Sequence, residues 1–146
     1  IGNDSPLLVN ALFGYAAACK DAGHLDKSTE QYIRAIAILE KANGPDSQIL
    51  VLPLQHLGLA LLERGNHVEA EQTLSRCLQL ATAHYGPNAP ELSGALEMLA
   101  TLLHHMERHT EAEPLARQSL LLCEARYGRE HPFSGTTLVS RLLSMV

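Results

Sequence analysis

Histidine is the residue type in this chain that most invites a chemical interpretation, because imidazole nitrogens bind metals and exchange protons near neutral pH. Eight histidines occur in 146 residues, and three of them lie close together as His104, His105 and His109. His104 and His105 are neighbours that point in different directions, and an expected turn separates them from His109. The zinc-site spacings Cys-x-x-Cys and His-Glu-x-x-His do not occur. We therefore expect no metal site.

The other reactive residue types also lack the spacing that catalysis needs. Cys19, Cys77 and Cys123 fall on expected helical faces that meet the core, where a thiol serves as a small hydrophobic group. No Gly-x-Ser-x-Gly sequence and no glycine-rich phosphate loop is present. We expect no enzyme, no catalytic residue and no cofactor. Three cysteines do not make a disulfide framework, which favours a reducing compartment such as the cytoplasm.

Composition and charge argue against two classes of partner. The formal net charge is −5, and the eleven lysines and arginines are dispersed, whereas nucleic acids and anionic membrane surfaces are bound by a basic face. The longest apolar stretch, residues 49–62, is too short to cross a bilayer. The chain begins with Ile instead of Met, so we expect a fragment, and an organelle is not excluded.

The sequence resembles itself at an offset of 42 residues. The letters NGP at 43–45 align with YGP at 85–87, and HVEAE at 67–71 aligns with HTEAE at 109–113. No gap is needed anywhere. Several independent matches at one spacing indicate a repeat architecture.

Each repeat contains two stretches with helical spacing of apolar residues, separated by a tight turn such as Arg64-Gly65-Asn66. The expected helices are 5–22, 25–43, 47–64, 67–85, 89–106, 109–127 and 132–145. They form one domain over residues 1–146, with repeats at about 7–48, 49–90 and 91–132. The segment 132–146 either caps the third pair or begins a fourth repeat. Pro53 lies inside the third expected helix, which therefore either begins late, near Val51, or is kinked.

This pattern resembles the tetratricopeptide repeat over essentially the whole chain. The family's small residue early in the first helix, its glycine in the turn and its small residue opening the second helix all have counterparts, although Glu107 replaces the turn glycine in the third repeat. The matching residues are Ala16, Gly58 and Ala100, then Gly23 and Gly65, then Ser28, Ala70 and Ala112. The 42-residue period resembles the subtype found in kinesin light chains. The resemblance implies an all-α fold, a right-handed superhelix of three antiparallel helix pairs with a C-terminal capping helix.

In this family the first helix of each pair lines a concave groove that holds a peptide or a partner helix. Carried onto this chain, the groove consists of Asn10, Phe13, Ala17, Lys20, Leu52, Gln55, Leu59, Leu62, Glu97, Thr101, His104, His105, Val139 and Leu143. Its middle is apolar, which suits the apolar face of an amphipathic helix. The same leucines could instead belong to the core.

Two binding chemistries of the family are missing from the matching positions. Phe13, Ala17, His56, Gly94 and Met98 stand where co-chaperones carry the charged donors of a carboxylate clamp, and Gly14, His56, Met98 and Ser140 stand where kinesin light chains carry an asparagine ladder. The sequence therefore predicts a protein-interaction scaffold that binds a partner helix or an extended peptide in an apolar groove. The alternative is a structural or self-association module that uses the ends of the stack, motivated by the apolar face of the last helix.

Overall fold

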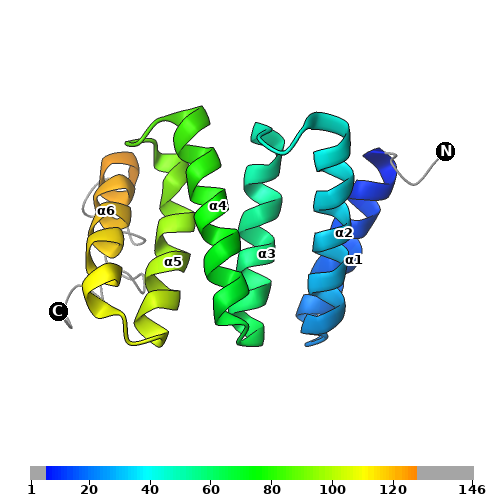
Figure 1. The fold of residues 1–146 in the computed structure, drawn as a ribbon, viewed down its shortest axis with the longest axis horizontal. Coiled ribbons are helices and arrows are strands. Elements are labelled where there is room, and N and C mark those ends of the chain that lie inside the picture. Colours follow the sequence, from blue (N-terminus) through cyan, green and yellow to red (C-terminus); the bar gives the residue numbers. More distant parts are fainter. Residues whose placement is uncertain (1–5, 128–146) are drawn as a thin grey trace. The chain divides into compact units, whose positions relative to one another are not determined.

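The computed structural model describes residues 6–127, which form six α-helices (Figure 1). The helices make three antiparallel pairs: α1 (Pro6–Asp21) with α2 (Leu25–Asn43), α3 (Val51–Arg64) with α4 (His67–Tyr85), and α5 (Ser93–His105) with α6 (His109–Tyr127). The expected helix at 132–145, and with it the cap, lies outside the described residues. The chain divides into two compact units, residues 1–80 and 81–146, with the boundary inside α4.

The turn inside each pair has the same hydrogen-bond pattern at the same repeat position. The backbone N–H of His24, Asn66 and Arg108 donates to the carbonyl of the residue five positions earlier, at 2.7, 3.0 and 2.8 Å. This pattern closes the end of a helix when the residue before the donor adopts a left-handed conformation. Gly23 and Gly65 have φ values of 86° and 88°, and Glu107 has a φ of 61°. The predicted glycine turn is therefore confirmed, and the third repeat forms it with a residue that disfavours it.

The substitution Glu107→Gly is expected to raise the free energy of unfolding by about 1 kcal/mol, because glycine adopts a left-handed conformation without the steric cost of a Cβ atom. Chemical denaturation followed by circular dichroism measures this gain. The matched control is Gly65→Ala, which places a Cβ in the corresponding turn and should lower stability by a similar amount. A loss of stability in Glu107→Gly would show that the Glu107 side chain contributes more than its backbone costs.

The connections between pairs are also built alike. A short 3-10 turn precedes α3 (Gln48–Leu50) and another precedes α5 (Pro90–Leu92). Arg76 in α4 donates to the carbonyl of Pro45 at 2.9 Å, and Gln118 in α6, one repeat later, donates to the carbonyl of Pro87 at 3.2 Å. Arg76 also pairs with Glu40 in α2 at 3.1 Å. Each second helix thus holds the loop that leads into its own pair.

Pro53 does not kink α3. The structure chooses the first of the two alternatives, because η1 occupies Gln48–Leu50 and α3 begins at Val51. Pro53 then lies in the first turn, where a helix has no internal acceptor for its backbone N–H, so its missing donor costs nothing. The Ser47 hydroxyl accepts a hydrogen bond from the Ile49 N–H at 3.3 Å and caps the short turn.

Small residues allow the two helices of a pair to approach closely. Ala16, Gly58 and Ala100, at equivalent positions of the first helices, are all buried. A Cβ atom added at Gly58 would lie 2.3 Å from Cδ2 of Leu74 in α4, so the leucine occupies the space that the glycine leaves open. In the third repeat the equivalent partners are two alanines, Ala100 and Ala116, which share a core cluster.

Candidate partner-binding site

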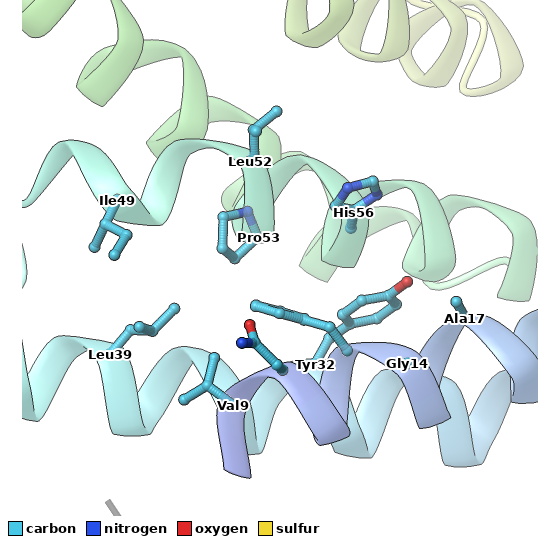
Figure 2. A pocket seen from close by; sticks show the side chains of 11 residues that line it. Val9, Gly14, Ala17, Tyr32, Leu39, Ile49, Leu52, Pro53 and His56 are labelled. Carbon is cyan, nitrogen blue, oxygen red and sulfur yellow. The ribbon is translucent and has the colours of Figure 1, made fainter. Parts of the chain in front are cut away.

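An apolar pocket of about 630 Å³ opens between α1, α2 and α3 in the first unit. Figure 2 shows Leu52, Pro53 and His56 of α3 facing residues of α1 and α2 across it. Its lining consists of Val9, Asn10, Phe13, Gly14, Ala17, Tyr32, Leu39, Ile49, Leu52, Pro53 and His56. Leu52 and Ile49 are 64% and 49% exposed, although both are apolar. A volume of roughly 300–1,000 Å³ is usual for a ligand site.

Three rings form one wall of this pocket. Phe13 of α1 lies 6.1 Å from Tyr32 of α2 in a tilted arrangement, and Tyr32 stacks on His56 of α3 at 6.0 Å between ring centroids. These separations are typical of aromatic pairs that stabilise each other. The wall therefore holds the three helices together and presents an apolar surface with a phenol and an imidazole at its edge.

The electrostatics of this edge favour neutral rings. Burial and the positive charge of Lys20 lower the pKa of His56, so its imidazole is neutral at physiological pH. Burial and the negative charges of Asp21 and Glu63 raise the pKa of Tyr32. Lys20 and Glu63 form an ion pair at 3.8 Å. The edge of the pocket thus carries charged groups around uncharged hydrogen-bonding rings.

Four of the residues expected in the groove line this pocket: Asn10, Phe13, Ala17 and Leu52. Lys20 is half-buried in its ion pair with Glu63. Gln55, Leu59 and Leu62 are half-buried on α3 and are not part of the pocket lining. Tyr32 was not predicted, because the expected groove included first helices alone and Tyr32 belongs to a second helix. The scarcity of aromatic residues, 4% of the chain, is the signal that could have singled it out.

The remaining candidates lie in the second unit or beyond the described residues. Thr101 is buried, and its hydroxyl donates to the carbonyl of Glu97 at 2.9 Å. Burial raises the pKa of the Glu97 carboxyl. His104 contacts His109 with 3.1 Å between the two Nδ1 atoms, and His105 is exposed beside it. Val139 and Leu143 lie outside the described residues.

Within residues 6–127 no group of three or more His, Cys, Asp or Glu side chains could hold a metal ion. In the same part of the chain, no helix is both long and apolar enough to span a membrane. The buried thiols are those of Cys19 and Cys77, and Cys123 is half-buried.

Antiparallel helix pairs repeated at one interval define an α-helical repeat protein. The family model of the tetratricopeptide repeat matches residues 48–120, half of the chain, and the chain belongs to this family. Tetratricopeptide domains are generally protein–protein interaction modules and are typically non-catalytic, so protein partners are the general expectation for the chain. No curated protein matches the sequence significantly.

Three solved structures have the same fold. BtubC (BKLC) from P. vanneervenii is 15% identical with a TM-score of 0.83, and the match covers 95% of this chain and 55% of that one. A candidate kinesin light chain from Podosopora anserina with nearly identical TPR-like repeats is 17% identical with a TM-score of 0.74, covering 86% and 60%. A point variant of that protein gives 17%, 0.83, 99% and 66%. The chain spans less than two thirds of each, and the likeness to kinesin-light-chain-type repeats is confirmed for the fold.

Proposed function

We propose that this chain is a protein-interaction scaffold, a single domain of three repeats that binds a partner helix or an extended peptide in an apolar groove. The observation that carries the proposal is the pocket between α1, α2 and α3, with its largely hydrophobic lining. Most large apolar side chains in the first unit are buried. Exposed leucine and isoleucine on the wall of a cavity are therefore best explained by a ligand that covers them.

The chemistry of the pocket describes the ligand. The apolar lining suits one or more large aliphatic or aromatic side chains, such as those spaced three and four apart on an amphipathic helix. Asn10 and Tyr32 supply an amide and a hydroxyl that can hydrogen-bond to the ligand's polar groups. The charged residues at the edge, Lys20, Asp21 and Glu63, correspond to the polar rim that surrounds the hydrophobic centre of a typical interface.

The rest of the expected groove belongs to the same proposal. Gln55, Leu59 and Leu62 on α3 and His104 and His105 on α5 are the positions that would extend contact along a longer segment. The free cysteines, two of them buried, support the proposal that the domain works in a reducing compartment such as the cytoplasm.

The substitution Leu52→Asp is expected to weaken ligand binding at least 10-fold, because a carboxylate in an apolar pocket must be desolvated when a hydrophobic side chain enters. The measurement is peptide-display selection on the wild-type chain, followed by titration of each selected peptide against the variants. Because Leu52 is 64% exposed, the substitution should leave the fold intact, as circular dichroism would verify.

The matched control is Val68→Asp, which places the same charge on a residue that is 66% exposed in the first turn of α4 and does not line the pocket. Selected peptides should bind this variant as they bind the wild type. Peptides that bind both variants equally well would refute the assignment of the pocket as the anchoring site.

A further inference from the structure

The helix α1 exposes a second apolar surface that is distinct from the pocket. Between Pro6 and Cys19 the helix contains no charged residue. Leu7, Ala11, Tyr15 and Ala18 are all exposed, with Leu7 at 69% and Tyr15 at 51%. Spacings of four, four and three residues place them on one side of the helix, and we call them the α1 stripe.

The repeat relates this stripe to a surface that is buried elsewhere in the molecule. One repeat later, Ala11, Tyr15 and Ala18 correspond to Pro53, Leu57 and Ala60 of α3, which are all buried. Leu57 borders the seam between α3 and α2, together with Ile36. The corresponding residues of α5, Ala95, Leu99 and Leu102, are buried as well. The α1 stripe is thus the helix-packing face of the repeat, and it is uncovered on α1.

The order of side chains in the stripe fits a second copy of itself. Along the helix it alternates large and small residues: Leu7, Ala11, Tyr15, Ala18. When a second α1 runs antiparallel to the first, Leu7 faces Ala18 of the other copy and Ala11 faces its Tyr15. With a rise of about 1.5 Å per residue, both pairs match to within about 1.5 Å along the axis. Large side chains then lie opposite small ones in both directions, as in well-packed helix interfaces.

We propose that the α1 stripe is a homodimer surface, on which a second copy of this chain packs its own α1 in antiparallel orientation. The contact is isologous, so each copy contributes the same residues. The absence of charge on the stripe means that no ionised group is desolvated when the copies meet. The pocket faces a different side of α1, through Asn10 and Phe13, so dimerisation and peptide binding are separate properties.

Sedimentation equilibrium over a wide concentration range tests the proposal. The wild type should show a reversible monomer–dimer equilibrium. The substitution Tyr15→Lys should weaken it roughly 100-fold or more, because it removes an aromatic anchor from each copy and places two like charges in the contact. The matched control is Ile33→Lys, since Ile33 on α2 is 49% exposed and lies outside the stripe. Dimerisation of this control and of Leu52→Asp should be unchanged.

Three results would overturn the proposal: a wild type that stays monomeric at the highest concentration, a dimer that survives Tyr15→Lys, or a dimer that Ile33→Lys weakens equally. In the first case the stripe is left for a helix of another chain. A failure of the Leu52→Asp peptide experiment would not affect any of these outcomes, so the two proposals fail separately.

The orientation has its own test in a Cys123→Ser background. In an antiparallel dimer the two copies of residue 11 lie about 5 Å apart along the axis and the two copies of residue 7 about 17 Å apart. A short bismaleimide should therefore link Ala11→Cys dimers and leave Leu7→Cys unlinked. Equal linking of both variants would indicate a parallel pair and overturn the antiparallel arrangement.

Discussion

Replacing Leu74 by Ala is expected to lower the free energy of unfolding by about 3 kcal/mol, or roughly 10 °C in melting temperature. Leu74 has no exposed surface, and it fills the space above Gly58, where a glycine replaces the alanine of the other two repeats. Its truncation leaves a cavity that the glycine on the opposite helix cannot fill. Denaturant unfolding followed by circular dichroism measures the loss.

The partner substitution Gly58→Ala tests the same packing from the other side. Its methyl group would lie 2.3 Å from Cδ2 and 2.6 Å from Cγ of Leu74, so the buried leucine must move. The cost of overpacking, about 1–3 kcal/mol, is partly offset by about 1 kcal/mol from the better helix propensity of alanine.

The double variant Gly58→Ala with Leu74→Ala recreates the alanine pair of the third repeat, Ala100 and Ala116. We expect it to lose about 1–3 kcal/mol less stability than the sum of the two single variants, because the new methyl group occupies part of the cavity. Strict additivity would show that the two positions do not compete for the same space.

Cys77 is expected to react with iodoacetamide at least 100-fold more slowly than Cys123 in the native protein. Burial raises the pKa of the Cys77 thiol from 9.0 to about 11, so at mildly alkaline pH the reactive thiolate is about 100-fold rarer than for an ordinary cysteine. Cys77 has no exposed surface, whereas Cys123 is half-buried. Mass spectrometry of timed samples gives both rates, and comparable rates would contradict the burial of Cys77.

The same pKa has a consequence for stability. A thiol whose folded-state pKa lies above its unfolded value contributes stability that is complete below the unfolded pKa and is lost as pH rises through the folded one. For Cys77 this window runs from 9.0 to about 11. The control is Cys77→Ser, which should fold well because Ser119, one repeat later, donates to the Ser93 carbonyl as Cys77 does to that of Val51. It should lack this alkaline loss.

Much of the fold could be predicted because the sequence signals are local. The glycines at 23 and 65, the Gly-Pro phrases at 44–45 and 86–87, and the apolar spacing between them depend on conformations of a few consecutive residues. The limits of α2, α4 and α6 match the expected ranges. The start of α3 at Val51 was one of two alternatives, and it was settled by a short turn whose capping serine lies three residues before its end.

The candidate site could be predicted only in part, because it joins residues from three helices. Asn10, Phe13, Ala17 and Leu52 belong to first helices, and the family resemblance pointed to them. Tyr32 reaches the pocket from a second helix, by packing between Phe13 and His56, and no periodicity in one helix reveals such a contact.

The sequence by itself determined that this protein is a stack of helical hairpins, since a pattern repeated every 42 residues specifies the same local turns and the same apolar faces each time. The tertiary structure alone decided which apolar faces stay uncovered. Pro53, Leu57 and Ala60 read like Ala11, Tyr15 and Ala18 as sequence, and yet α2 covers the first set while the second is exposed. The physical reason is that burial depends on which helix lies opposite, and that neighbour is distant in the chain.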